Sequence, residues 1–502
     1  MDTIQLSVCL FLLISFIIST WKMYKRRWRL PPGPLPLPLL GNLLQGATKL
    51  YETHNKFSKQ YGPVFTVWLG TSPVVALCGY DVVKDALIKC SQQFSFRGSI
   101  PISETLSKGY GIITTNGKRW HQMRKFTALT LRNSGMGKRS MEQRIQEEAV
   151  FLVQAISDKH GDAFDPHTLL GRSVNNVINL TVFGKRWQYE DEQFLKFLET
   201  TNNLFNFIRA PIGVAYSAFQ KVMQYLPGSH QKIFQDCEHM KSLIQDQINS
   251  HRETLDEDSP RDYIDCFLIR ANKEQWLQES EFCIENLISL VFELFMAGTE
   301  TTANTLQFGL LVMIKFPHVQ ERVQKEIDSV IGTERLPKLA DRIQMPYTNA
   351  VLHEILRFLD LVPLALPHVV MEDIFYRGFN IPRGTTIFPV LGSVLSDPAC
   401  WETPDKFNPG HFLDHNGQFC MNDAFIPFSA GKRICPGEEV ARIETFLFLT
   451  SLLQKFTFRA INHPDNIDLK TLRRAFRKHG LQYHLKAYPR THATDIIHGN
   501  II

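Results

Sequence analysis

The stretch "FIPFSAGKRICPGEE", Phe425–Glu439, decides how the rest of the chain is interpreted. It places Cys435 between Gly431 and Gly437, shortly after the cation Arg433. Glycine permits backbone conformations and close approaches that a side chain would block. A thiol in front of a helix meets amide N–H groups and the positive end of the helix dipole, which lower its pKa. Because Arg433 is a fixed cation suited to a carboxylate, the pattern indicates a metal-ligating thiolate beside a bound anionic group.

The overall composition is that of an ordinary folded protein. The chain has 502 residues, of which 44% are hydrophobic and 21% charged, and this length alone suggests two or three domains. The net charge of +5 is too small and too evenly spread to indicate nucleic-acid binding, but it suits an acidic partner or a membrane surface. The nine cysteines include no Cys-x-x-Cys pair. We therefore expect reduced thiols in a cytosol-facing protein, with neither a disulfide framework nor a zinc site.

The N-terminal residues predict a membrane anchor. The run Ile4–Trp21 carries no charge and is close to the minimum length of a membrane-spanning helix. A cleavable signal peptide carries its cations in front, whereas here Asp2 lies in front and the cations follow. This cation excess favours a cytoplasmic position for the chain behind it. We expect a transmembrane signal anchor at 1–21, followed by a basic stop-transfer segment and proline-rich hinge at 22–42.

The remainder, residues 43–502, is expected to form one catalytic domain that is mainly α with a small β-rich portion. Residues 63–80, "PVFTVWLGTSPVVALCGY", predict two strands joined by a turn, because β-branched and aromatic residues cluster on both sides of a Gly-Thr-Ser-Pro sequence. Apolar residues at three- and four-residue spacing predict helices over 139–156, 282–314 and 438–456.

The cysteine stretch resembles the haem-ligand loop of the cytochromes P-450. Every fixed position of that family pattern is filled, by Phe428, Gly431, Arg433, Cys435 and Gly437. The resemblance continues from the proline hinge to about Phe458 and is closest to the vertebrate microsomal family-2 members. It implies the cytochrome P-450 fold and haem b bound through the Cys435 thiolate, with Phe428 packed near the haem. It also implies a single-pass protein of the endoplasmic reticulum membrane, with its catalytic domain in the cytosol.

The long central helix carries a second motif, "AGTETT", Ala297–Thr302. By itself this is weak evidence, because a threonine hydroxyl inside a helix often bonds a carbonyl one turn earlier and bends the helix. The resemblance implies that the bend opens a groove over the haem, that Ala297 contacts the haem, and that Glu300 and Thr301 are the catalytic acid–alcohol pair that relays protons.

Two further sets of residues match positions of the family. Glu354 and Arg357 resemble its buried Glu-x-x-Arg ion pair, completed here by His411, with a structural role. The haem propionates, being buried carboxylates, require cations and donors. The resemblance assigns this contact to Arg97, Trp120, Arg124, His368 and Arg433. The Trp-x-x-x-Arg spacing in "WHQMR" places two of them on one face of a helix.

The chain contains no nucleotide-binding fingerprint, so its electrons must come from a partner. "GMGKRS", residues 135–140, lacks the first glycine of a phosphate loop and has Arg139 where a Ser or Thr is required. The resemblance implies NADPH-cytochrome P-450 reductase as the donor, with cytochrome b5 as a second candidate. Cations in 116–125, in 132–139 and at Lys432 are candidates for a basic docking face, and a merely solvated face is the alternative.

The function implied is a membrane-anchored haem-thiolate monooxygenase that inserts one atom of O2 into a lipophilic fatty acid, steroid or xenobiotic. Two alternatives remain open: an oxygen-independent haem-thiolate isomerase or dehydratase, and a non-catalytic membrane protein that binds haem or sterol. By resemblance the pocket draws on segments near 99–113, 204–208, 293–301 and 362–367, and on a C-terminal turn. That turn, "LRRAFRKHGLQY", is basic where relatives have a small apolar loop, which favours an acidic substrate if it lines the pocket.

Overall fold

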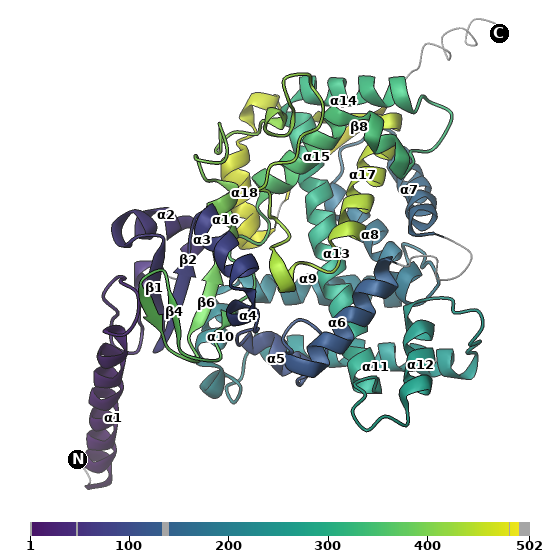
Figure 1. Cartoon of the computed structure of the whole chain (residues 1–502). Coiled ribbons are helices and arrows are strands. Elements are labelled where there is room, and N and C mark those ends of the chain that lie inside the picture. Colours follow the sequence, from purple (N-terminus) through teal and green to yellow (C-terminus); the bar gives the residue numbers. More distant parts are fainter. Residues whose placement is uncertain (1–2, 47–48, 133–139, 481, 491–502) are drawn as a thin grey trace, which may run out of the picture.

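The computed structural model describes residues 3–46, 49–132, 140–480 and 482–490 (Figure 1). Most of this part of the chain is helical and surrounds the central helix α13, and the N-terminal helix α1 projects away from the body. The helices are α1 Thr3–Arg27, α2 Leu50–Tyr61, α3 Tyr80–Lys84, α4 Ser91–Phe94, α5 Pro101–Ser107, α6 Gly117–Arg132, α7 Met141–Ser157, α8 Pro166–Val182, α9 Glu192–Arg209, α10 Pro211–Met223, α11 Ser229–Glu253, α12 Tyr263–Glu274, α13 Ile284–Lys315, α14 Pro317–Val330, α15 Pro346–Leu359, α16 Leu391–Leu395, α17 Glu438–Lys455 and α18 Leu469–His479.

The strands form three small sheets, which confirms the expected class of a mainly α protein with a small β portion. The largest sheet has the order β1-β2-β6-β3, and β1 and β2 are the antiparallel pair predicted from residues 63–80. The turn between them contains Gly70, whose φ of +61° is a conformation that favours glycine. The strands are β1 Val64–Leu69, β2 Ser72–Leu77, β3 His368–Val369, β4 Ile374–Tyr376, β5 Phe379–Ile381, β6 Thr386–Pro389, β7 Phe456–Ala460 and β8 Leu485–Pro489.

The three helices predicted from apolar periodicity are present as α7, α13 and α17. At the start of α7, the Ser140 hydroxyl accepts from the Gln143 N–H at 3.2 Å and the Gln143 side chain accepts from the Ser140 N–H at 3.0 Å. This reciprocal cap satisfies two backbone donors that a helix start otherwise leaves open. In α13, a Cβ at Gly298 would lie 2.6 Å from Ile178 Cδ1, so glycine permits the close approach of α8.

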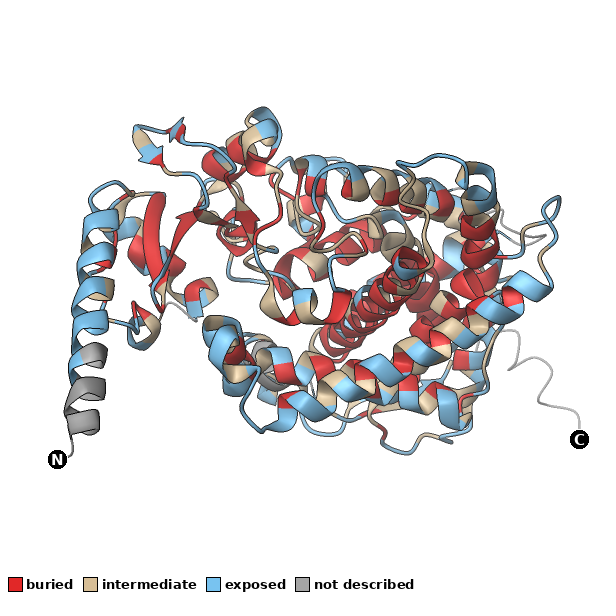
Figure 2. Ribbon diagram, turned by 90° about the horizontal axis from the view of Figure 1, so that it is seen from below, coloured by how far each residue is buried: buried red, intermediate tan, exposed pale blue. Residues whose placement is uncertain are grey.

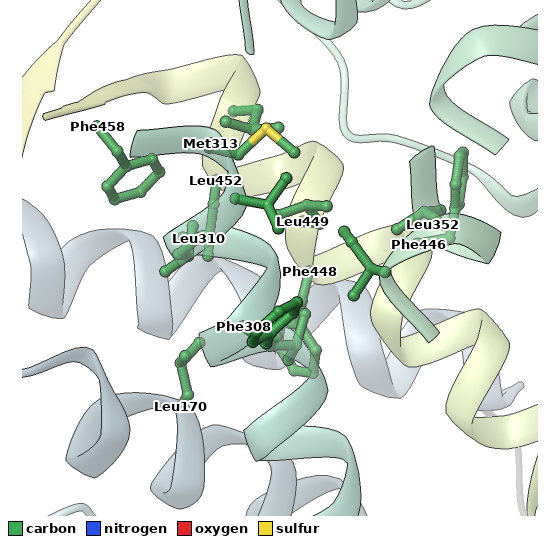
Figure 3. Close-up of a cluster of buried hydrophobic side chains, with 14 of the residues drawn as sticks. Leu170, Phe308, Leu310, Met313, Leu352, Phe446, Phe448, Leu449, Leu452 and Phe458 are labelled. Carbon is green, nitrogen blue, oxygen red and sulfur yellow. The ribbon is translucent and has the colours of Figure 1, made fainter. Parts of the chain in front are cut away.

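The main hydrophobic core lies between α13, α15 and α17 and reaches the strand β7 (Figure 3). Leu310, Phe446 and Leu452 are fully buried there. Each such side chain contributes roughly 1.5–3 kcal/mol relative to an exposed position. Figure 2 shows that many buried residues lie in these central helices. The part of α1 that is coloured by burial is mostly exposed. This core holds α13 and α17 together, and both helices also line the cavity described below.

A buried ion pair ties α15 to the segment in front of the cysteine loop. Arg357 Nε and Nη2 donate to the two carboxylate oxygens of Glu354 at 2.6 and 2.7 Å, and His411 Nδ1 lies 3.3 Å from Glu354 Oε2. Arg357 also donates to the carbonyls of Leu395 and Pro404. This geometry confirms the expected Glu-x-x-Arg pair and its completion by His411. Because both charges are desolvated, removing one partner leaves the other unpaired, which costs about 3–5 kcal/mol.

Across the described ranges, no helix combines the length and the apolar character needed to cross a membrane.

Candidate functional site

The cysteine loop is a tight connection between a short 3-10 turn, Gly431–Arg433, and the start of α17. The Cys435 N–H donates to the Phe428 carbonyl at 2.9 Å and closes the loop. Gly431 has a φ of +70°, and a Cβ there would lie 1.9 Å from the Leu87 carbonyl oxygen. Glycine is therefore required at this position on both conformational and steric grounds.

The accessible surface of Cys435 belongs to an internal cavity, so the thiol is enclosed by protein although it is not covered by packed side chains. The cavity is built from α6, α13, α17, the cysteine loop and the chain around β3. Nine of the ten predicted site residues line it: Arg97, Trp120, Arg124, Ala297, Thr301, His368, Phe428, Arg433 and Cys435. The tenth, Glu300, is not among its lining residues. These nine residues come from five separate segments of the chain and are brought to one space around the sulfur atom.

The pKa of the Cys435 thiol is raised, whereas the sequence led us to expect that the start of the following helix lowers it. Burial raises the pKa of this thiol, while hydrogen bonds from the Gly437 and Glu438 amides and the charge of Arg124 lower it. The net direction is upward, so the expectation of a lowered pKa is wrong for the free thiol. The amide donors that the sequence predicted are nevertheless present and favour the thiolate.

Three guanidinium groups form one wall of the cavity, which we call the cation wall: Arg97, Arg124 and Arg433. Within the described residues, none of them has a carboxylate partner at ion-pair distance. Their side-chain hydrogen bonds there go to carbonyl oxygens and to Asn116. Burial, reinforced by mutual repulsion, lowers the pKa of Arg97 to about 10 and that of Arg433 to about 9. The Arg433 guanidinium lies 3.8 Å from the ring centre of Trp120.

The cation wall fits an anionic group. Arg433 Nη1 is buried without a hydrogen-bond partner, which leaves one donor directed at no protein acceptor. Buried cations without an anion are costly, and two carboxylates would relieve the repulsion and accept these donors. His368, on the same side, has its pKa lowered to about 3 by burial and by Arg97, so it is neutral at physiological pH. The donor set is therefore suited to the two propionates of a haem.

Another wall of the cavity is formed by α13. The Thr301 hydroxyl donates to the Ala297 carbonyl at 2.7 Å, as expected for a threonine that bonds one turn back. Glu300 is buried and its Oε1 lies 3.3 Å from Arg209 Nη2 on α9. The acid and the alcohol of the predicted pair therefore occupy different environments. Thr301 lines the cavity, while Glu300 is held in an ion pair behind it.

Another carboxyl of α13, Glu293, does line the cavity. It accepts hydrogen bonds from the Ile112 N–H at 2.7 Å and from the Ile113 N–H at 3.3 Å. Burial raises its pKa to about 8, although these amides and the more distant Lys241 oppose the shift. The sequence placed Glu293 in a pocket segment but gave it no role. The available signal was a charged residue within the apolar run "LVFELF".

Two expected pocket segments lie elsewhere. Leu204 and Phe207 of α9 pack in a hydrophobic cluster and are not among the residues that line this cavity. The C-terminal turn begins as the helix α18, where Arg473 donates to the Phe358 carbonyl at 2.8 Å. None of its described residues lines the cavity. The side chains of 475–479 and residue 481 lie outside the described part of the chain, so the acidic-substrate interpretation of this turn stays a prediction.

Comparison with known proteins identifies the family. The model of the family described as Cytochrome P450 matches residues 31–486. The chain belongs to the cytochrome P450 family. It is 47% identical to cytochrome P450 2C16 of Oryctolagus cuniculus over 472 residues, 94% of this chain and 96% of that protein. It is 45% identical to human cytochrome P450 2A13 over 488 residues, 97% and 98% of the two chains.

Membership agrees with the chemistry of the cavity. Cytochromes P450 bind haem b through a cysteine thiolate, and the cavity contains a cysteine with amide donors as well as cations for carboxylates. The chain is accordingly a haem-thiolate monooxygenase of family-2 character and an oxidoreductase. The fold, mainly α with small sheets, is the cytochrome P450 fold.

Proposed function

We propose that this cytochrome P450 holds haem b in the cavity described above, with the Cys435 thiolate as the iron ligand. The observation that carries the proposal is the convergence of Cys435 and the cation wall on one cavity. In this arrangement Arg97, Trp120, Arg124, His368 and Arg433 bind the propionates, and Phe428 and Ala297 pack against the ring. When bound, the thiolate-ligated haem supplies the activation of O2.

The residues of the chain then have separate tasks. The cation wall orients the cofactor by charge-assisted hydrogen bonds, which are directional and strong in a desolvated site. The apolar side chains Ile113, Val362 and Leu366 exclude water and bind an apolar substrate. Thr301 presents a hydroxyl to the cavity, and Glu300 is the acid behind it, which must part from Arg209 to exchange a proton.

The proposal also includes an electron donor and a cellular location. We propose that NADPH-cytochrome P450 reductase supplies the electrons, with cytochrome b5 as a second donor. Of the predicted docking cations, Lys118 and Arg119 pair with Glu279 and Glu281, and Lys432 is exposed. Most of the predicted segment 132–139 lies outside the described residues. The uncharged run and the cations behind it support anchoring by 1–21 in the endoplasmic reticulum membrane, with 22–42 as the hinge and 43–502 as the catalytic domain.

The substrate is proposed to be a small lipophilic molecule such as a fatty acid, a steroid or a xenobiotic. The side chains on the α13 side and around 361–366 that line the cavity are mostly apolar, while Glu293 is the acidic group among them. A preformed apolar cavity with few polar groups is typical of sites for molecules of this kind.

The ferrous carbon monoxide spectrum tests the ligand. The wild type is expected to give the red-shifted Soret band of thiolate ligation, and Cys435→Ala is expected to lose both the band and turnover. NADPH consumption coupled to an oxygenated product, with added reductase, separates a monooxygenase from an oxygen-independent isomerase. A Cys435→Ala protein that keeps the band would refute the ligand assignment. A wild type without any haem band would refute the haem site.

A further inference from the structure

Asn116, directly before α6, connects two members of the cation wall. Its side-chain Oδ1 accepts from the Arg97 N–H at 2.7 Å and from Arg433 Nη2 at 2.6 Å. Its Nδ2 donates to the Arg97 carbonyl at 3.0 Å. Because an amide oxygen can accept two hydrogen bonds and an amide nitrogen only donates, these three contacts fix the orientation of the side chain. Asn116 thus joins segments of the chain that are far apart in sequence.

The Arg433 guanidinium is held by the protein along one edge. Its Nε donates to the Ser95 carbonyl at 2.8 Å, and its Nη2 donates to the Thr115 carbonyl at 2.9 Å as well as to Asn116. Nη1 is buried and has no hydrogen-bond partner in the described part of the chain. Since a guanidinium is planar and rigid, fixing one edge also fixes the direction of the remaining donor. Asn116 therefore helps to set where Arg433 can bind an anion.

Asn116 also holds the main chain that carries Arg97. It bonds both the N–H and the carbonyl of this residue, as a paired strand would. The Arg97 guanidinium extends from that fixed point to the carbonyls of Ile113 and Leu366, at 3.1 and 3.0 Å. Among the residues that the structure describes, no other side chain forms hydrogen bonds to more than one member of the cation wall.

The acceptor that Asn116 provides is neutral. A carboxylate at this position would pair with Arg433 and reduce the positive charge available to a ligand, whereas an amide oxygen accepts the same hydrogen bonds without a charge. The buried cations Arg97 and Arg433 repel each other, and the amide leaves this repulsion in place until an anion binds. The arrangement fixes the cations without neutralising them.

We propose that Asn116 is a positioning residue for haem binding, whose neutral amide fixes Arg433 and the main chain of Arg97 and leaves their positive charge to the propionates. The inference rests on the proposed function, in which the haem occupies this cavity. Asn116 is exposed and is not among the residues that line the cavity, so it acts through the two arginines. It is expected to influence the haem dissociation rate and, through the charge near the propionates, the reduction potential.

Two substitutions separate the position of the cations from their charge. Asn116→Ala removes all three hydrogen bonds and is expected to raise the rate of haem transfer to apomyoglobin on the order of fivefold, because a hydrogen bond to a charged group is lost. Asn116→Asp keeps an oxygen for Arg433 but adds a negative charge, and it is expected to raise the rate at least as much. The added charge opposes the uptake of an electron, so only Asn116→Asp is expected to lower the ferric–ferrous reduction potential clearly. Because the position is exposed, both variants are expected to fold.

Asn42→Ala is the matched control. Asn42 Oδ1 accepts from the Trp68 N–H at 2.8 Å, and its Nδ2 donates to the Leu35 carbonyl at 3.1 Å and to Gln45 Oε1 at 2.8 Å. The substitution therefore removes three hydrogen bonds outside the cation wall. It is expected to lose at least as much stability in urea as Asn116→Ala, because Asn42 is fully buried, but to keep the wild-type haem dissociation rate and potential. An equal increase of the dissociation rate in Asn42→Ala and Asn116→Ala would overturn the proposal.

A double-mutant cycle tests whether Asn116 acts through Arg433. Asn116→Ala is expected to raise the haem dissociation rate by a smaller factor in the Arg433→Gln protein than in the wild type, because the partner is already gone. An equal factor in both backgrounds would contradict the proposed route. A wild type without the thiolate band would refute the proposed haem site itself. A wild type with that band, and Asn116 variants that release haem at the wild-type rate, would overturn only the role of Asn116.

Discussion

The two walls of the cavity satisfy their charges in different ways. On the cation wall, Arg97, Arg124 and Arg433 face the cavity and have backbone carbonyls and Asn116 as their described partners. On the α13 wall, Glu293 accepts from backbone amides and Glu300 is paired with Arg209. The acids of α13 thus have partners within the protein, whereas the cations of the cation wall fit an anion that is not part of the chain.

This difference indicates which substitutions affect haem binding and which affect the folding of the chain. Cations that repel one another lower each other's pKa, and an anionic ligand reverses this effect when it binds. Ligand binding to the folded state alone stabilises that state by mass action. We therefore expect substitutions on the cation wall to act mainly through haem retention, and substitutions on the α13 wall to act mainly through the folding of the chain.

The largest effect is expected from the backbone that supports the cation wall. Gly431→Ala introduces a Cβ into contact with the Leu87 carbonyl at a positive φ, and we expect a loss of more than about 3 kcal/mol and little or no haem incorporation. Gly417→Ala is the matched control, because its φ is +75° but its Cβ would meet open space. It is expected to cost only about 1–2 kcal/mol. Urea unfolding and haem content measure both, and equal losses in the two variants would contradict the steric argument.

The second-largest effect is expected when a substitution on the cation wall is compared with one behind the α13 wall. Arg433→Gln removes a cation from the cation wall and is expected to lower haem retention on the order of tenfold, since a charge-assisted hydrogen bond contributes about 1.5–3 kcal/mol. Arg209→Gln removes a cation from behind the α13 wall and is expected to leave haem retention unchanged. Haem transfer to apomyoglobin measures the dissociation rate in both. Equal haem retention in Arg433→Gln and the wild type would contradict the assignment of the cation wall to haem binding.

The features that could be predicted from the sequence are those that depend on interactions between residues close together in the chain. The cysteine loop could be predicted because its glycines, cation and thiol are adjacent in sequence and each answers a local requirement. The helix face of Trp120 and Arg124 followed from a four-residue spacing. The pairing of Glu300 with Arg209 could not be predicted, because the two residues are 91 positions apart and no local pattern joins them.

The smallest expected effect concerns the α13 wall and depends on pH. The pKa of Glu293 is about 8 in the folded protein and near its ordinary value of 4.5 in the unfolded chain. Between these values the folded state binds more protons than the unfolded state, so Glu293 lowers the free energy of unfolding as pH rises from about 5 to 8. Glu293→Gln removes this dependence while its side-chain oxygen can still accept from the Ile112 and Ile113 amides. Relative to the wild type, the variant is therefore expected to gain stability with pH.

Each unit of difference in pKa corresponds to about 1.4 kcal/mol, so the gain between pH 5 and pH 8 is expected to exceed about 1 kcal/mol. Urea unfolding of the holoenzyme at several pH values measures it. Glu444 has a similarly raised pKa, but it is present in both proteins and its contribution cancels in the difference. Glu300→Gln serves as the control on the same helix, and it is expected to lose stability because the buried ion pair between Glu300 and Arg209 is lost. Parallel pH profiles for Glu293→Gln and the wild type would mean that Glu293 is ionised in the folded protein, and the α13 wall would then carry a buried charge that the amides alone stabilise.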